Sequence, residues 1–387
     1  MNILLVIADL GLGGAQQVVI NLANEFVRQK NKVWIFDIYP ELREKGMTKR
    51  MNKEVHLISH NYNDIKLDKK DKIVDFFLSK TSLNQTRNKI LFKHHKKNLK
   101  TIISKNNINF VNSHVCWADY FVYKNLKNLH KKWIITLHAS YNSLFSYSKN
   151  KYLKITKKTI LSAKKIIYIH DDGLHFLEKL FETKFYNAKK IFNGVPNLLL
   201  NLNVNRQILG LSKKDFVVLC ASRAIKEKGW FELCESVTLL KNENIKLIFA
   251  GEGIILDEIQ KKYSSNDAIM FLGFQTNIND IINLSDLVCL PSYSEALPTI
   301  LIESLFLKKP IIATNVGEVS NIVENINGKC GILIPKSKGE RLVQNLSKAI
   351  LNTYENRIEI NKEVFDKAVI FFSVENMVSE YIKFFKK

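Results

Sequence analysis

Two glutamates, Glu295 and Glu303, are separated by seven residues, and Pro298 between them is placed to begin a helix. The apolar run Leu287–Leu290 precedes this segment and predicts a buried strand that ends in a loop. Backbone N–H groups at a helix start lack intrahelical acceptors, so those of Leu297–Ile300 are suited to bind a diphosphate. Glu303 falls within the first two turns, where its carboxylate can accept hydrogen bonds from paired ribose hydroxyls.

A glycine-rich loop near the N-terminus is a second place where the backbone can approach an anion. Gly11-Leu12-Gly13-Gly14-Ala15 follows the expected strand Ile3–Ala8 and opens a helix that runs to about Lys30. The spacing fails the dinucleotide-binding pattern, because Gln16 stands where the third glycine is expected. Asp37 closes the second expected strand like a ribose-binding acid, so a nicotinamide-dinucleotide site remains open, as does a turn without a ligand.

Helix-length segments alternate with short β-branched runs along the whole chain, which is typical of parallel sheets with crossover helices. In the first half the expected strands are Ile3–Ala8, Val33–Ile38, Phe110–His114, Trp133–Leu137, Lys165–Ile169 and Lys190–Phe192. In the second half they are Val217–Ala221, Ile245–Ala250, Ile269–Leu272, Leu287–Leu290, Pro310–Ala313 and Gly331–Ile334. The sequence therefore predicts two α/β domains, each built on a sheet of about six strands.

The length of 387 residues also favours two domains, because single hydrophobic cores stop growing at about 250–300 residues. The periodicity is interrupted near Asn193–Asn205, a stretch that contains Pro196. We expect an N-terminal domain over residues 1–196 and a C-terminal domain over residues 197–372. A closing helix within residues 373–387 is long enough to pack back across the join.

Almost all of the excess positive charge lies in one half of the chain. Residues 1–196 hold 35 Lys and Arg against 15 Asp and Glu, a net charge of +20, whereas residues 197–387 hold 23 against 22. This asymmetry indicates a polyanionic partner for the first half, either membrane lipid or nucleic acid. A solvated lysine-rich surface without such a partner is the simpler alternative.

Two stretches of the basic half are candidates for contact with an anionic membrane. Asp71–Ser104 combines lysines and histidines with apolar residues at helical spacing, which predicts a basic amphipathic region. Phe145, Tyr147 and Tyr152 lie among further lysines. No recognised nucleic-acid-binding motif accompanies the charge.

Composition restricts the class of protein further. No apolar run approaches the roughly 20 residues of a membrane-spanning helix. The N-terminus enters a strand without a preceding basic segment, so we expect no signal peptide and a cytosolic protein. The five cysteines lack CxxC spacing and are expected to be reduced core residues.

Further motifs extend over nearly the whole chain. Besides Glu295 and Glu303 they are Gly13-Gly14-Ala15, Phe192-Asn193-Gly194-Val195-Pro196, Arg223 with Lys228-Gly229, Gly251-Glu252-Gly253, Leu272-Gly273-Phe274 and Pro310-Ile311-Ile312-Ala313-Thr314. In this order they resemble glycosyltransferase family 4, a group of retaining enzymes with the GT-B fold. The resemblance implies an α/β protein of two Rossmann-like domains whose parallel sheets face each other across a cleft.

The resemblance implies that Arg223 and Lys228 grip the diphosphate of a nucleotide sugar. Two cations beside a helix N-terminus can neutralise the charge that develops on such a leaving group. Glu303 would hold the ribose and Glu295 a sugar hydroxyl, while Gly273 and Phe274 would flank the base. The full expected donor set is Gly14, Arg223, Lys228, Gly253, Gly273, Phe274, Glu295, Ala296, Leu297, Pro298, Thr299 and Glu303.

The expected acceptor-binding residues are Gly13, Gly14, His114 and His138. His138 follows the strand Trp133–Leu137 and matches the family histidine that faces the transferred sugar. His114 ends its strand, where a substrate contact and a satisfied histidine at the core edge are both open. The expected catalytic residues are His138, Arg223, Lys228 and Glu295.

One position departs from the family pattern. The family often reads Gly-Gly-x-x-Glu after the Ala-Thr strand, whereas this chain has Gly317-Glu318-Val319-Ser320-Asn321. Asn321 thus replaces a carboxylate, which leaves the identity of the donor sugar open.

We expect no metal and no cofactor besides the nucleotide sugar. The sequence lacks Asp-x-Asp, and paired cations with a helix dipole can replace a metal ion. The segment from His170 to His175 contains histidines and aspartates, which are residue types that bind metal ions. Asp171 or Asp172 is a natural helix cap there, so we expect no metal site.

The expected function is retaining transfer of a hexose or N-acetylhexosamine from a nucleotide sugar, with UDP preferred as the carrier. We expect a lipid-linked or envelope polysaccharide acceptor, at the cytoplasmic face of the membrane. The alternatives are a nucleotide-sugar epimerase of GT-B architecture, a nucleic-acid-binding protein that uses the basic half, and an inactive domain pair that binds a partner.

Overall fold

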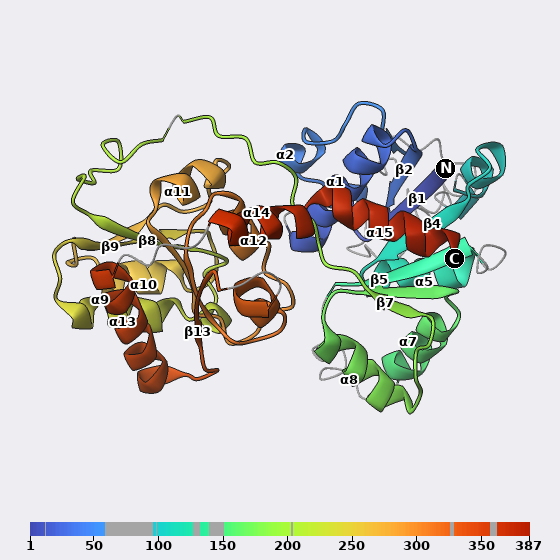
Figure 1. Ribbon diagram of the computed structural model, residues 1–387. Coiled ribbons are helices and arrows are strands. Elements are labelled where there is room, and N and C mark those ends of the chain that lie inside the picture. The colour runs from blue at the N-terminus through green and yellow to red at the C-terminus, as the bar shows by residue number, and fades with distance from the viewer. Residues whose placement is uncertain are drawn as a thin grey trace, which may run out of the picture. The chain divides into compact units, whose positions relative to one another are not determined.

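The protein is described by a computed structural model that covers residues 1–11, 13–58, 96–97, 99–126, 132–138, 151–202, 204–325, 329–356 and 362–387. The chain divides into two compact units (Figure 1). Unit 1 comprises residues 1–194 and 377–387, and unit 2 comprises residues 195–376. The boundaries expected from sequence, after residues 196 and 372, fall within four residues of this division.

Unit 1 contains a parallel sheet in the order β3-β2-β1-β4-β5-β6-β7. Its strands are β1 (Asn2–Ile7), β2 (Lys32–Asp37), β3 (His56–Leu57), β4 (Phe110–His114), β5 (Trp133–Leu137), β6 (Lys165–Tyr168) and β7 (Ala188–Lys190). Six of them overlap the strands expected from sequence, although β7 begins two residues earlier than expected. The edge strand β3 was not expected, because two residues carry no period that sequence analysis can detect.

The helices of unit 1 follow the strands in the manner of crossover connections. They are α1 (Gly14–Arg28), η1 (Pro40–Leu42), α2 (Lys45–Thr48), α5 (Cys116–Asn125), α7 (Lys151–Leu161) and α8 (Asp171–Phe181). The last helix of the chain, α15 (Val374–Lys386), belongs to unit 1 from Met377 onward.

Helix α15 is anchored in unit 1 by aromatic packing and by polar contacts. Phe385 stacks on Phe26 and Phe110, with ring centroids 6.1 and 4.8 Å away. The hydroxyl groups of Tyr381 and Thr136 are hydrogen-bonded at 3.3 Å, and both residues are buried. The end of the chain therefore completes the core of unit 1.

Unit 2 contains a six-stranded parallel sheet in the order β10-β9-β8-β11-β12-β13. Its strands are β8 (Phe216–Ala221), β9 (Ile245–Ala250), β10 (Ile269–Phe271), β11 (Leu287–Leu290), β12 (Ile311–Thr314) and β13 (Gly331–Ile334). Its helices are η4 (Lys226–Lys228), α9 (Trp230–Leu240), α10 (Leu256–Lys262), α11 (Ile278–Leu284), α12 (Thr299–Phe306), η5 (Asn321–Asn325), α13 (Gly339–Asn356) and α14 (Lys362–Phe371). All six strands lie where the sequence predicts them, to within one residue at either end.

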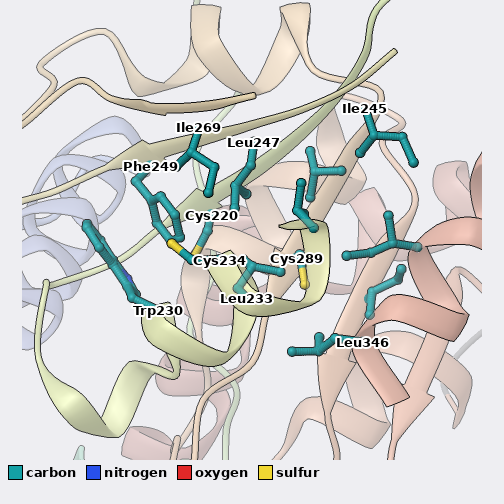
Figure 2. Close-up of a cluster of buried hydrophobic side chains, with 14 of the residues drawn as sticks. Cys220, Trp230, Leu233, Cys234, Ile245, Leu247, Phe249, Ile269, Cys289 and Leu346 are labelled. Carbon is teal, nitrogen blue, oxygen red and sulfur yellow. The ribbon is translucent and has the colours of Figure 1, made fainter. Parts of the chain in front are cut away.

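The core of unit 2 gathers where the sheet meets α9 and α13 (Figure 2). Trp230 stacks on Phe249, with ring centroids 4.3 Å apart. Cys220, Cys234 and Cys289 are buried in the same cluster, and burial raises the pKa of Cys220 to about 12. All five cysteines of the chain are free thiols, and these three are enclosed by apolar side chains.

Both sheets place their first strand in the middle, with the chain then turning to the other side. In unit 1 this reversal lies between β1 and β4, and in unit 2 it lies between β8 and β11. At such a reversal, the loops that follow the two adjacent strands lead in opposite directions. This leaves a crevice at the carboxyl ends of the strands, where ligands of α/β proteins bind. We therefore expect ligand-binding residues directly after these four strands.

Part of the predicted basic amphipathic region packs into the protein itself. Leu99 is fully buried in the core of unit 1, and Ile102 packs against that core. The apolar face is therefore engaged at these two positions. Residues 71–95, and also Phe145 and Tyr147, lie outside the described residues. Within the described part of the chain, no helix has the length and hydropathy needed to cross a membrane.

Candidate functional site

The loops that follow β8 and β11 are joined by their backbones. The amide of Tyr293, after β11, donates to the carbonyl oxygen of Glu227, after β8, at 2.8 Å. Gly229 has a φ of 66°, and a Cβ atom there would lie 2.3 Å from the carbonyl oxygen of Pro291. Only a glycine allows this close approach. The contact sets the position of the preceding residue, Lys228.

Lys228 and Glu295 form the ion pair at the centre of the candidate site. Lys228 Nζ lies 2.5 Å from Glu295 Oε1, and the two side chains are 14% and 11% exposed. Ser292 donates its hydroxyl hydrogen to the same oxygen at 2.7 Å. The pair therefore brings a cation and a carboxylate from the two strand ends together, in a place that is largely shielded from water.

The neighbouring strand ends are joined to this site through their backbones. The amide of Ala224, after β8, donates to Glu252 at 2.9 Å, and the amide of Gly251, after β9, donates to Gly273 at 2.8 Å. Gly317, after β12, has a φ of 55°, and its Cα lies so close to the backbone of Glu295 that a Cβ atom would be 2.2 Å from that carbonyl oxygen. Backbone contacts thus link five neighbouring strand ends, from β10 to β12, in a row that includes the loops of Lys228 and Glu295.

Helix α12 begins directly beyond this pair. Pro298 is its N-cap residue, and Thr299 is its first residue, so the N–H groups of the first turn open toward the loop that carries Glu295. Leu301, Ile302 and Leu305 are fully buried and hold the helix against the sheet. Glu303 lies in the second turn and is half-buried.

The remaining expected donor residues lie on the same edge of the sheet. Arg223 is exposed and stands two residues after the end of β8. Gly273 and Phe274 follow β10, and Phe274 is 48% exposed. Gly253 packs on Ala224, where a Cβ atom would lie 2.4 Å from the carbonyl oxygen. Among all these residues, the structure shows a direct contact between side chains for Lys228 and Glu295.

The position that departs from the family pattern has a partner in the structure. Asn321 donates its side-chain amide to Glu318, a carboxylate that is only 4% exposed. The amide of Glu318 donates in turn to the carbonyl oxygen of Ala296 at 2.9 Å. The chain therefore keeps a carboxylate at this turn, three residues before the position that Asn321 occupies.

In unit 1, His114 and His138 lie together at the carboxyl ends of β4 and β5. Nδ1 of His114 and Nε2 of His138 are 2.8 Å apart. Burial lowers the pKa of His138 to about 4, and burial together with His138 lowers the pKa of His114 well below its ordinary value. His114 is fully buried, so the expected contact between its own ring and an acceptor does not fit this structure. His138 is half-buried.

The glycine loop after β1 is held by a carboxylate that sequence analysis did not single out. Asp9 Oδ1 accepts hydrogen bonds from the amide of Gly11 at 2.9 Å and from the side chain of Gln16 at 3.1 Å. Gln16, which breaks the dinucleotide pattern, thus fixes the loop. The sequence did contain a signal for this role, because Asp9 is an acidic residue directly after the expected central strand Ile3–Ala8. Gly13 caps α1, which begins at Gly14.

The structure does not favour the nicotinamide-dinucleotide alternative. Asp37 is fully buried, and Arg43 binds both of its carboxylate oxygens, with Nε 2.6 Å from Oδ2 and Nη2 2.7 Å from Oδ1. Asp37 would have to bind the ribose of a dinucleotide, but both of its carboxylate oxygens already accept hydrogen bonds from Arg43.

The histidine and aspartate residues near position 170 have structural roles. The N-cap of α8 is His170, whose Nδ1 accepts a hydrogen bond from the amide of Gly173 at 3.1 Å. The expectation that Asp171 or Asp172 caps this helix is therefore wrong. Asp171 instead pairs with Lys190 at 2.6 Å. In the described ranges, no three His, Cys, Asp or Glu side chains are grouped so that they could hold a metal ion.

Comparison with known families identifies the segment that carries this site. Residues 203–364 match the family model described as glycosyl transferases group 1. Over this segment, which makes up less than half of the chain, the protein resembles the glycosyl transferases group 1. The matched residues include Arg223, Lys228, Glu295 and Glu303, so the ion pair lies within the segment that resembles this family.

Two relatives have names that specify a carrier-linked sugar. UDP-Gal:alpha-D-GlcNAc-diphosphoundecaprenol alpha-1,3-galactosyltransferase of Escherichia coli is 23% identical over 49% of this chain and 54% of its own length. N,N'-diacetylbacillosaminyl-diphospho-undecaprenol alpha-1,3-N-acetylgalactosaminyltransferase of Campylobacter jejuni is 24% identical over 59% of this chain and 56% of its own length. The alignments thus span about half of these relatives.

The fold is shared with solved structures over the whole chain. HepE of Anabaena, crystallised in complex with UDP, is 17% identical, with a TM-score of 0.70 and coverage of 99% of both chains. At this identity the likeness concerns the fold alone. It confirms the expected α/β class, with two Rossmann-like parallel sheets of the GT-B kind.

The contact between Gly229 and Pro291 makes a stability prediction with an internal control. Gly210 has a φ of 69° and no atom within 4 Å of an added Cβ, so Gly210→Ala should cost only the conformational strain of about 1–2 kcal/mol. Gly229→Ala has a similar φ and adds a clash with the backbone, so its free energy of unfolding should fall by about 3 kcal/mol or more. Urea unfolding of both variants measures the difference. Equal losses would show that the approach to Pro291 is not tight.

Proposed function

We propose that the chain is a glycosyltransferase that moves a sugar from a nucleotide diphosphate donor, with the donor bound in unit 2. The observation that carries the proposal is the Lys228–Glu295 pair at the reversal point between β8 and β11. A cation and a carboxylate held together there match the two ends of a sugar diphosphate, which presents anionic oxygens and hydroxyl groups. The family of this segment supports the same assignment.

The donor diphosphate would bind between Lys228, Arg223 and the N-terminus of α12. Lys228 is already positioned by its contact with Glu295, and the amides at the start of α12 add the positive end of the helix dipole. As the bond from sugar to phosphate breaks, negative charge grows on the leaving diphosphate, and these groups stabilise it. In this proposal a metal ion is not required.

The two glutamates would hold the two ends of the donor. Glu303, in the second turn of α12, accepts hydrogen bonds from ribose hydroxyls. Glu295 exchanges its partner: when the diphosphate draws Lys228 away, the carboxylate becomes free to accept a hydrogen bond from a hydroxyl of the sugar. Ser292 keeps Glu295 Oε1 in place during this exchange. We further propose that the reaction retains the anomeric configuration and that UDP is the carrier.

Turnover and donor binding test the assignment together. A screen of UDP, GDP and ADP sugars first identifies the donor, because a ligand at a hundred times its Kd adds about 2.7 kcal/mol of stability. Lys228→Ala and Glu303→Ala should then each lower transfer at least about a hundredfold, equal to about 2.7 kcal/mol of transition-state stabilisation.

Lys226→Ala is the matched control for these variants. Lys226 belongs to the same short helix as Lys228 but is exposed, so its removal should leave transfer near the wild-type rate. Far-ultraviolet circular dichroism confirms that each variant is folded. Near wild-type turnover in both Lys228→Ala and Glu303→Ala would contradict the proposal.

For the acceptor we propose a lipid-linked saccharide at the cytoplasmic membrane surface. The two relatives named above act on diphospho-undecaprenol-linked sugars, and the first half of this chain carries a net charge of +20. Each Lys or Arg near an anionic leaflet contributes about 1 kcal/mol of attraction, so a few of them suffice for salt-sensitive attachment. Nucleic acid is not the proposed partner of this charge.

Helix α7 presents part of the basic surface. Leu153 and Ile160 pack toward the core of unit 1, whereas Lys154 and Lys158, one turn apart, are exposed, and Leu161 is 50% exposed. Lysines beside an exposed leucine suit a headgroup region, where charge and apolar surface are both satisfied. We therefore place α7 at the proposed membrane contact.

Reversal of charge on α7 tests this contact. Lys154→Glu together with Lys158→Glu should weaken binding to vesicles that contain anionic lipid by at least about thirtyfold, since two lysines contribute about 2 kcal/mol. Lys213→Glu with Lys214→Glu, an exposed pair in unit 2, is the matched control and should change binding little. Co-sedimentation measures both. Binding that depends neither on anionic lipid nor on salt would contradict the membrane proposal.

A further inference from the structure

Two histidines of unit 1, His114 and His138, form a hydrogen-bonded pair at the end of the sheet. In the register of β4 and β5, His114 stands beside Thr136, and His138 follows two residues later. This brings Nδ1 of His114 to 2.8 Å from Nε2 of His138, with the ring planes inclined by 33°. That separation is a hydrogen bond, because two ring nitrogens without a shared hydrogen would repel each other at this distance.

The hydrogen bond links the tautomers of the two rings. A neutral imidazole carries one N–H and one bare nitrogen. If Nδ1 of His114 carries the hydrogen, Nε2 of His138 must be bare, and His138 carries its own hydrogen on Nδ1. If Nε2 of His138 carries the shared hydrogen, Nδ1 of His114 must be bare. His138 therefore cannot change its tautomer unless His114 changes with it.

The surroundings of His114 make these two arrangements unequal in free energy. Its Nε2 atom is buried and has no hydrogen-bond partner in the part of the chain that the structure describes. One arrangement leaves a buried N–H unpaired there, and the other leaves a bare nitrogen. Unpaired buried groups cost about 1–3 kcal/mol each, and the cost differs between a donor and an acceptor, so a single arrangement should prevail.

Both rings also resist protonation, which preserves the arrangement. Burial lowers the pKa of His138 to about 4, and the pKa of His114 is lowered well below its ordinary value by burial and by its neighbour. Two protonated rings at this distance would repel each other. The pair therefore remains neutral near pH 7.

We propose that His114 is a positioning residue that locks His138 into one tautomer. This inference rests on the proposed function and on the expectation, implied by the family resemblance, that His138 faces the transferred sugar. A locked tautomer fixes whether Nδ1 of His138 presents a hydrogen-bond donor or an acceptor to a hydroxyl group. His114 thus acts through His138 and does not touch the substrate, in agreement with its complete burial.

Nitrogen-15 NMR of ring-labelled histidine tests the proposal without any substrate. The chain has nine histidines, and the signals of His138 are assigned by their loss in His138→Gln. In the wild type, one ring nitrogen of His138 should have the shift of an N–H and the other that of a bare nitrogen, unchanged between pH 8 and about 5.5. Averaged shifts for the two nitrogens would overturn the proposal.

The variant His114→Leu removes the hydrogen bond and keeps an apolar side chain in the buried position. In His114→Leu, the shifts of His138 should move to averaged values, because either tautomer is then free to form. Far-ultraviolet circular dichroism shows whether His114→Leu is folded, so a change in the shifts of His138 can be assigned to the lost hydrogen bond. The proposal fails if a folded His114→Leu variant leaves His138 in one tautomer. If the wild-type protein transfers no sugar, the proposed function is rejected, but the NMR result on the tautomer of His138 still stands.

Discussion

The ion pair of Lys228 and Glu295 is the interaction on which the rest of the site depends. It joins the loops after β8 and β11, the two strands between which the sheet of unit 2 reverses its order. Two charges shielded from water are costly unless each is well paired, so the backbone around them has to be held accurately. Gly229 against Pro291, and Gly317 against Glu295, provide that accuracy through backbone contacts that a larger residue would prevent.

The strand ends of the two units contrast in electrostatics, and the charged ones belong to the unit in which we propose that the donor binds. The site of unit 2 collects a lysine, a carboxylate and the start of α12. The strand ends of unit 1 instead carry a histidine pair that burial keeps neutral. Charged groups suit a diphosphate that gains charge during transfer, whereas a neutral ring suits a hydroxyl group that only needs a hydrogen bond.

Most of the fold follows from sequence, because central parallel strands are continuous apolar runs that end in recognisable turns. The strand β3, with two residues, gives no such signal. The sequence also places Lys228 and Glu295 after neighbouring strands, but their direct contact depends on Gly229 and Pro291, which are far apart in the chain. The cap at His170 and the bond from Asn321 to Glu318 were missed for a different reason, because each joins residues three positions apart, where several neighbouring side chains could serve as the partner.

The most direct test of this account is the affinity for UDP of wild type and of Glu295→Gln, measured by titration calorimetry. The substituted side chain would keep the shape of the glutamate, but its neutral amide would no longer neutralise Lys228 or repel a diphosphate. We therefore expect UDP to bind about tenfold more tightly to the variant, a gain of about 1.4 kcal/mol, even though transfer is impaired. Weaker binding of UDP to Glu295→Gln than to wild type would contradict a site in which Lys228 exchanges Glu295 for the diphosphate.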